Sequence, residues 1–269
     1  MTDDSDIAWL GLDRHGDGSW SFELTSELTR HDGKLFGGTG IAVTVATMEA
    51  ETGRDTLWTT VQYASSADLG ARIDCDVEVL ASGKRTSQVR LTATVDDRIV
   101  LAAVGATGVP RSGPIEAQIP AMPAMPPPDE CTTWAFTPHT HGTERPPSWM
   151  QLTDMRYVSE GSGIWARMRS GLHTRATIAF LADMIPSSVA RAAGKMGGGT
   201  SLDNSLRFGR LVDSEWILLD MDPWFATGGY LHGAARVWAD DGTLLGVASQ
   251  TSSAIVWQGD MPPWLAANR

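Results

Sequence analysis

Residues 36–51, Phe-Gly-Gly-Thr-Gly-Ile-Ala-Val-Thr-Val-Ala-Thr-Met-Glu-Ala-Glu, decide the fold of this 269-residue chain. After Gly37-Gly38, small and apolar residues recur at helical spacing, which predicts a buried helix from Ile41 to Glu51. Its core residues are expected to be Ile41, Ala42, Val45, Ala46 and Met48. Gly53 follows where a C-terminal cap is expected.

Strand patterns lie on both sides of this helix. Trp20 to Leu28 alternates as a half-buried strand does, and four strand-like runs follow the helix, near 56–65, 71–80, 85–95 and 98–107. Polar turn residues separate the runs, with Ser82-Gly83 and Asp96-Asp97 as the clearest turns. The order is therefore a strand, a helix and an antiparallel meander.

The second half of the chain repeats this order. Strands are expected from Met155 to Arg169, a helix from Thr174 to Arg191, a break at Gly197-Gly198-Gly199, and strands at 201–209, 214–221, 229–239 and 243–256. The helices align at an offset of 138 residues and the last hairpins at 144, so the glycine-rich loop must absorb the difference. The repeat rests on element order more than on identities.

A proline-rich stretch separates the halves. Ten of the fourteen prolines lie between Val109 and Pro147, a density that forbids helix and central strand. We expect an N-terminal domain at 1–108, a linker at 109–150 and a C-terminal domain at 151–269. The alternative is a long ordered loop lying across a single domain.

Composition limits the class of protein. A net charge of −11 argues against a nucleic-acid-binding protein, because phosphate binding needs clustered Lys and Arg. Cys75 and Cys131 show no disulfide or zinc pattern, which favours a reducing compartment, and we expect the cytoplasm. The acidic start differs from a secretory signal, and no apolar run reaches the length of a membrane span.

Three polar residues interrupt apolar or strand-forming runs in the second half: Asp183, Ser201 and Gln250. A polar group facing a core costs free energy unless it is paired, so these three suggest one shared site. Pro186 has no N–H for the carbonyl of Ala182, which opens the helix beside Asp183 and leaves room for a water. Apolar neighbours should raise the pKa of Asp183 and make it a plausible general base; the alternative is an exposed aspartate near a kink.

A helix wrapped by an antiparallel sheet, present twice, is an α+β double-hotdog arrangement, with two long helices. The chain resembles acyl-CoA thioesterase II in this order of elements and in five segments: Phe36-Gly37-Gly38, residues 180–186, Ser201 to Ser205 with Arg210, residues 215–219, and Ala248-Ser249-Gln250. The resemblance covers nearly the whole chain except the linker and the termini. No single segment is specific, but their order and spacing are.

The resemblance implies that an Asp, Thr and Gln set activates a water to hydrolyse an acyl-CoA thioester, without a cofactor. Asp183 matches the aspartate and Gln250 the glutamine, while Ser201 replaces the threonine and keeps its hydroxyl. Asn204 stands where several relatives have His, which bears on substrate range. Relatives commonly form homo-oligomers, and we expect the same here.

The two predicted helices divide the features of a single-hotdog thioesterase between them. Such enzymes have two glycines at the helix start and an acid seven residues later. The first helix has Gly37 and Gly38 but Val45 at the acid position, whereas the second has Arg175-Ala176 and then Asp183. This predicts one working site, in the second half. The glycines could expose N–H groups to a thioester carbonyl, although close helix packing explains them equally well.

Other candidates carry weaker signals. Lys84, Arg85, Arg207 and Arg210 could meet the phosphates of coenzyme A, or be simply solvated. Cys131, His139 and His141 lack a fourth ligand, so we expect no metal site. No Gly-x-Ser-x-Gly motif supports a serine nucleophile.

Two other functions stay open. A hotdog hydratase or dehydratase typically needs an Asp and His pair, and no His lies in the second helix or on the strand that carries Ser201. A catalytically silent acyl-CoA-binding module is also compatible with the Ser201 and Asn204 differences.

Overall fold

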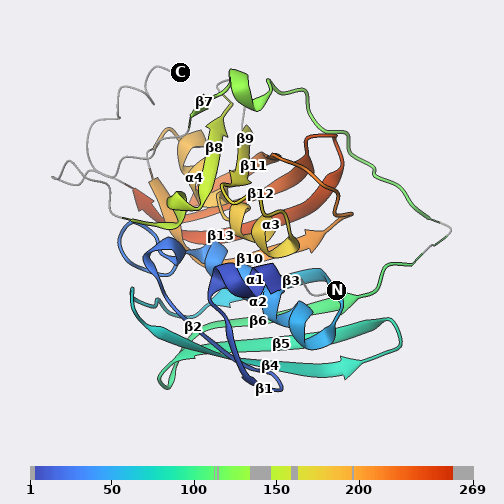
Figure 1. Ribbon diagram of the computed structural model, residues 1–269. Coiled ribbons are helices and arrows are strands. Elements are labelled where there is room, and N and C mark those ends of the chain that lie inside the picture. The colour runs from blue at the N-terminus through green and yellow to red at the C-terminus, as the bar shows by residue number, and fades with distance from the viewer. Residues whose placement is uncertain are drawn as a thin grey trace.

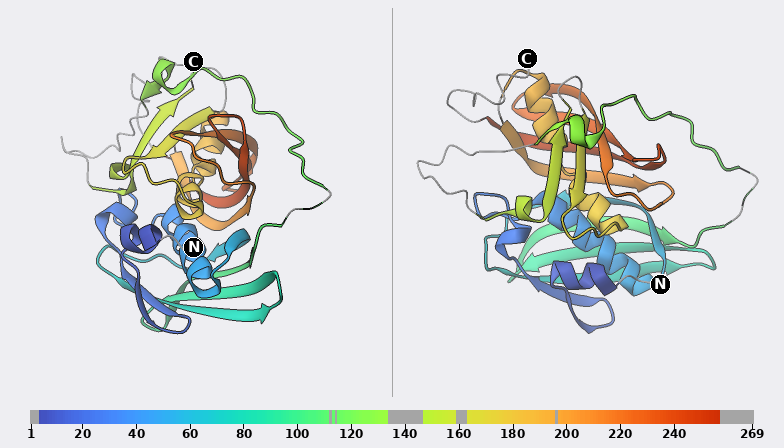
Figure 2. Two further views of the ribbon diagram at one scale, coloured as in Figure 1. Left: turned by 45° about the vertical axis from the view of Figure 1, so that its right-hand side comes forward. Right: turned by 45° about the horizontal axis from the view of Figure 1, so that its top comes forward.

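A computed structural model describes residues 4–111, 113, 115–133, 147–158, 163–195 and 197–256. The two halves of the chain lie one against the other, with helices packed between the curved strands of the two halves (Figure 1). Figure 2 shows the N-terminal half, in blue and teal, and the C-terminal half, in yellow to red, from two further directions.

The N-terminal half contains the predicted strand, helix and four further strands in that order, preceded by a short helix and a short strand that were not predicted from the sequence. Its elements are α1 (Asp4–Leu10), β1 (Asp13–Gly16), β2 (Ser19–Glu23), the 3-10 turn η1 (Ser26–Leu28), α2 (Gly37–Thr52), β3 (Asp55–Tyr63), β4 (Arg72–Ser82), β5 (Thr86–Val95) and β6 (Arg98–Gly108). The strand predicted from Trp20 to Leu28 is shorter, since it ends at Glu23 and a 3-10 turn follows. Gly53 caps α2 as predicted, with φ 62° and its N–H donating to the carbonyl of Glu49.

The C-terminal half repeats the order. Its elements are the turn η3 (Trp149–Gln151), β8 (Thr153–Tyr157), β9 (Gly163–Met168), α3 (Arg175–Leu181), α4 (Ile185–Ala192), β10 (Gly197–Phe208), β11 (Ile217–Thr227), β12 (Tyr230–Ala239) and β13 (Leu244–Val256). The predicted break at Gly197 to Gly199 is wrong, because these glycines begin β10 and pair with β13. Glycine is needed there for close approach: a Cβ on Gly199 would lie 2.3 Å from Ser252 Oγ.

One antiparallel sheet joins the halves. Its strand order is β1-β2-β4-β5-β6-β3-β10-β13-β12-β11-β9-β8-β7, where β7 is the short strand Thr132–Thr133. At the centre β3 pairs with β10, and Val61 faces Asn204. Outward from this centre, β3-β6-β5-β4 on one side corresponds to β10-β13-β12-β11 on the other. The predicted meander is therefore correct for β4-β5-β6 and wrong for β3, which pairs with β6 instead of β4. The internal repeat that the order of elements predicted is therefore visible in the structure, because the strands have the same order on both sides of the centre.

The second predicted helix is broken. Instead of one helix from Thr174 to Arg191, α3 ends at Leu181 and α4 begins at Ile185. Pro186 explains the break, because it cannot donate to the carbonyl of Ala182, which instead accepts from the N–H of Met184 at 2.8 Å. In place of the two long helices predicted, the structure thus has the 16-residue α2 and the two short helices α3 and α4. The break places Asp183 between α3 and α4.

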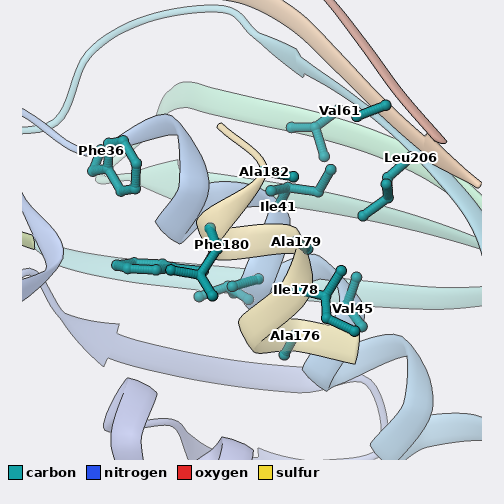
Figure 3. Close-up of a cluster of buried hydrophobic side chains, with 14 of the residues drawn as sticks. Phe36, Ile41, Val45, Val61, Ala176, Ile178, Ala179, Phe180, Ala182 and Leu206 are labelled. Carbon is teal, nitrogen blue, oxygen red and sulfur yellow. The ribbon is translucent and has the colours of Figure 1, made fainter. Parts of the chain in front are cut away.

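The helices α2 and α3 pack against each other in the middle of the molecule, and α4 packs on the strands of the C-terminal half. Every residue of α2 from Gly37 to Met48 is buried, including all five predicted core residues. Small residues such as Ala176 and Ala179 face α2, while Val61 and Leu206 come from the two central strands (Figure 3). None of the described helices is long and apolar enough to cross a membrane.

The described part of the proline-rich stretch is an ordered loop along the C-terminal half. It contains the turn η2 (Pro128–Glu130) and β7 (Thr132–Thr133), which pairs with β8. Trp165 Nε1 donates to the carbonyl of Pro126 at 2.9 Å, and the Gln118 amide bonds to the backbone of Gly242 and Leu244. These contacts hold the loop against the C-terminal half.

Candidate active site

A cavity of about 320 Å³ lies where the two halves meet. The N-terminal half lines it with Arg30, His31, Asp32, Leu35, Phe36, Gly37, Tyr63, Ala64, Ser65 and Ser66. The following segments contribute Ser148, Trp149, Met150, Asp183, Met184, Pro186, Ser187, Gly198, Gly199, Thr200, Ser201, Leu202 and Ile255. The cavity therefore contains two of the three predicted catalytic residues, and its lining mixes apolar and polar side chains.

Asp183 is the buried carboxylate at this cavity. Its side chain is held at the break between α3 and α4, and the residue is only 8% exposed. Gln250 Nε2 donates to Asp183 Oδ1 at 2.6 Å, and Asn204 Nδ2 donates to the same oxygen at 2.9 Å. The backbone N–H of Gly38 also bonds to this carboxylate. Three donors from three elements thus fix its position.

Ser201 completes the predicted set. Gln250 Nε2 donates to Ser201 Oγ at 2.8 Å as well as to Asp183, so the three predicted catalytic residues form one connected group. Residues three apart on a regular strand point to opposite faces. A register shift between Ser201 and Asp203 acts as a β-bulge and lets Ser201 and Asn204 face the same site.

The glycine pair of α2 reaches the site from the other half. A Cβ on Gly37 would lie 2.5 Å from Asp183 Oδ2 and 2.9 Å from Ser201 Oγ, and one on Gly38 would lie 2.4 Å from the carbonyl of Phe180. The N-cap residue Phe36 makes no side-chain capping bond. The amides of Gly37 and Gly38 are therefore available to the carboxylate and to the cavity, whereas those of Thr39 and Gly40 donate to the carbonyl of Phe36. The distances support close packing as a reason for these glycines, and contact of their N–H groups with a thioester carbonyl stays a prediction.

Burial raises the pKa of Asp183 to about 7. Hydrogen bonds from Gln250, Asn204 and the Gly38 N–H, together with the charge of Arg30, oppose this rise and keep it from going further. A carboxyl with a pKa near neutral can accept a proton from water and return it at physiological pH.

Several lining residues were missed by sequence reasoning. Tyr63 donates its hydroxyl to the Gly37 carbonyl at 2.5 Å. Arg30 forms a two-point ion pair with Asp32, and its Nη1 reaches Thr200 Oγ1 at 3.4 Å. The available signals were weak: Arg30-His31-Asp32 stand just before Phe36-Gly37, and Tyr63 is an ordinary strand residue by type.

Trp149 and its neighbours come from the end of the predicted linker. The Trp149 ring stacks on Phe36 with centroids 4.5 Å apart and an interplanar angle of 8°, and the backbone N–H of Trp149 donates to the carbonyl of Thr29. The last three residues of the predicted linker are thus part of the cavity wall.

The predicted phosphate-binding cations lie elsewhere. Lys84 and Arg85 are exposed at the turn between β4 and β5, and Arg207 and Arg210 are exposed on or just after β10. None of the four lines the cavity. Their contact with coenzyme A stays a prediction. His139 and His141 lie outside the described residues, and Cys131 is only partly buried.

Both halves of the chain match family models. Residues 25–108 match the acyl-CoA thioesterase N-terminal domain, and residues 117–254 match the acyl-CoA thioesterase C-terminal domain. The chain therefore belongs to the acyl-CoA thioesterase family. A search of curated proteins found no significant match.

Solved structures share the fold over nearly the whole chain. A candidate thioesterase from Novosphingobium aromaticivorans DSM 12444 is 28% identical, with a TM-score of 0.81 over 92% of this chain and 98% of that one. The tesB protein of Mycobacterium avium subspecies paratuberculosis is 20% identical, with a TM-score of 0.77 over 96% and 100%. A hot dog fold protein of unknown function from Alicyclobacillus acidocaldarius is 19% identical, with a TM-score of 0.78 over 95% and 99%. The double-hotdog fold is thus shared among these proteins.

Proposed function

We propose that this protein hydrolyses acyl-CoA thioesters to a free acid and CoA, with Asp183 as the general base. The observation that carries the proposal is the buried Asp183 carboxylate at the cavity, hydrogen-bonded to Gln250 and next to Ser201. Burial raises its pKa to about 7, which suits a group that must exchange a proton with water. Membership of the acyl-CoA thioesterase family supports the same reaction.

The reaction then follows from the arrangement. The ionised Asp183 removes a proton from water, and the water oxygen forms a bond to the thioester carbonyl carbon. The resulting oxyanion is stabilised by the N–H of Gly37 at the start of α2, since the N–H of Gly38 bonds to Asp183. When the intermediate collapses, the carbon–sulfur bond breaks and Asp183 returns its proton to the leaving thiolate. Ser201 and Gln250 hold the water and the carboxylate in place.

In this proposal the halves have different roles. The N-terminal half, residues 1–108, supplies the start of α2 and has no catalytic acid of its own, while the C-terminal half, residues 151–269, supplies the three catalytic side chains. Cytoplasmic location and assembly into homo-oligomers remain predictions from the sequence.

A panel of acyl-CoA substrates tests the proposal. The purified protein should release free thiol, measured with a thiol-reactive dye, from at least one short, medium or long acyl-CoA. A hydratase would instead change the absorbance of a 2-enoyl-CoA without releasing thiol. Binding of acyl-CoA with neither change would indicate a silent module, and either result would refute the proposal.

A further inference from the structure

We infer that Tyr63 is a positioning residue that acts on Asp183 through the peptide group between Gly37 and Gly38. This inference rests on the proposed function. Tyr63 ends β3 in the N-terminal half, whereas Asp183 lies in the C-terminal half, so the link would make the site depend on both halves.

The geometry forms a continuous chain of hydrogen bonds. The Tyr63 hydroxyl donates to the Gly37 carbonyl at 2.5 Å, and the N–H of Gly38 bonds to the Asp183 carboxylate. That carbonyl and that N–H belong to one peptide group. A hydrogen bond to the carbonyl of an amide polarises it and makes its N–H a stronger donor. Tyr63 should therefore strengthen the bond that stabilises the ionised form of Asp183.

The sequence of α2 accommodates this contact. A Cβ on Gly40 would lie 2.8 Å from Tyr63 Cε1 and 3.4 Å from its hydroxyl oxygen. Gly37 and Gly40 are three residues apart and share one face of the helix, so the ring of Tyr63 lies close over the first turn. Burial raises the pKa of Tyr63 well above its ordinary value, so its hydroxyl remains a donor throughout the range of the test below.

Few other ionisable groups act on Asp183. Arg30, His31 and Asp32, from the loop before α2, line the same cavity, whereas Asp203 on β10 acts on Tyr63, whose pKa it helps to raise. The cations of the broken helix are engaged elsewhere, since Arg175 pairs with Asp55 and Arg191 stacks on Tyr157. The facing residue on β13, Gln250, is neutral. Of these groups Arg30 favours the ionised carboxylate, and the Tyr63→Phe change leaves it in place.

The test is the pH dependence of kcat/KM for Tyr63→Phe between pH 5 and 9. This change keeps the ring against Gly40 and removes only the hydroxyl. The acid limb should move to higher pH, which lowers kcat/KM about two- to tenfold at pH 6 and less than about twofold at pH 9. The KM for acyl-CoA and the thermal midpoint should stay near those of the unmodified protein. The matched control is Tyr230→Phe, at an exposed tyrosine on β12, which should leave the profile unchanged.

Two results would overturn the inference. One is a Tyr63→Phe profile that superimposes on that of the unmodified protein, and the other is an equal loss of activity at every pH, which a merely structural role predicts. If the unmodified protein releases no thiol, the proposed function fails. The carboxyl ¹³C shift of Asp183, titrated in both proteins, then decides the inference alone: the pKa of Asp183 must be higher in Tyr63→Phe.

Discussion

The starts of α2 and α3 are equivalent places in the two halves, yet their polar groups are used differently. At α3 the side chain of Thr174 accepts from the Thr177 N–H, and the side chain of Thr177 accepts from the Thr174 N–H. This capping box satisfies the helix start with residues of its own turn. At α2 the N-cap is Phe36, without a side-chain capping bond, and the Gly38 N–H bonds to Asp183. At α3 the N–H groups of Thr174 and Thr177 are thus hydrogen-bonded within the helix start, whereas at α2 the Gly38 N–H bonds to a residue of the candidate site.

The residues opposite these helix starts differ in the same way. Asp183 faces the start of α2, whereas the matching position in α2 is Val45, which is fully buried beside Ile178 (Figure 3). Arg175, the counterpart of Gly37, forms an ion pair with Asp55 at 3.1 Å. The place equivalent to the Asp183 site lies between Val45 of α2 and the start of α3. We interpret it as a site that has been filled by the packing of Val45 and by the ion pair of Arg175. The fold thus has two equivalent positions for a site: one has the Asp183 carboxylate opposite a helix start, and the other has Val45.

The largest effect is expected for Asp183→Asn. Loss of the base should reduce kcat about 10²- to 10⁴-fold, measured as thiol release from the best acyl-CoA. Asn keeps the size of the side chain and can still accept from Gln250. Retention of most of the activity would remove Asp183 from the proposed role.

Stability provides the control for that variant. Burial raises the pKa of Asp183 from about 4 in the unfolded chain to about 7 in the fold. Between these values the folded state binds more protons than the unfolded state, so the carboxyl destabilises the fold as pH rises. Asp183→Asn should therefore keep or raise the thermal midpoint at pH 8, with no such gain below about pH 4. A fall at pH 8 would mean that lost activity reflects unfolding.

Gly37→Ala should have the next largest effect. Its methyl group would meet Asp183 Oδ2 at 2.5 Å, and displacing a catalytic group by about 1 Å can cost about 10²-fold in rate. The matched change in the other half, Arg175→Ala, should alter kcat less than about twofold. Equal effects of the two variants on kcat would contradict the division between the halves.

Two substitutions of Ser201 test whether its hydroxyl group is needed for the reaction. Ser201→Ala should lower kcat roughly 5- to 150-fold, because it removes one hydrogen bond in a desolvated site. Ser201→Thr keeps the hydroxyl and should be tolerated. Both are measured at saturating acyl-CoA. If Ser201→Ala is as active as the unmodified protein, Ser201 is only a strand residue.

The smallest effect on rate is expected for Val45→Ala. Removal of its buried methyl groups should lower the free energy of unfolding by roughly 0.5 to 1.5 kcal/mol or more, measured by urea denaturation, with little change in kcat. A loss of kcat as deep as that of Asp183→Asn would show that the first half carries a working site.

Much of the fold could be predicted from the sequence because local patterns decide it. Alternation of apolar and polar residues predicted the central strands, and helical spacing of apolar residues with Gly53 at the end predicted α2. The break in the second helix was signalled by Pro186, but whether a helix bends or divides there depends on packing against other elements. The glycines of β10 were misread, because glycine marks a turn and a close approach equally well.

The site could be predicted only in part. Asp183, Ser201 and Gln250 stand out as polar residues in apolar surroundings, and the structure brings them within hydrogen-bonding distance. Tyr63 gave no such signal, because tyrosine is common in strands and its contact with Gly37 is 26 residues distant along the chain. The charges of Lys84 and Arg85 suggested phosphate binding, which stays a prediction; charge alone could not show that these residues lie outside the lining of the cavity.

The central claim is that an ionised, buried Asp183 activates water. Its most direct test is the pH dependence of kcat/KM for the unmodified protein with its best acyl-CoA. Because burial raises the pKa of Asp183 to about 7, kcat/KM should be constant above about pH 8 and fall about tenfold per pH unit below about pH 6.5. A rate that stays constant down to pH 5 would contradict the claim.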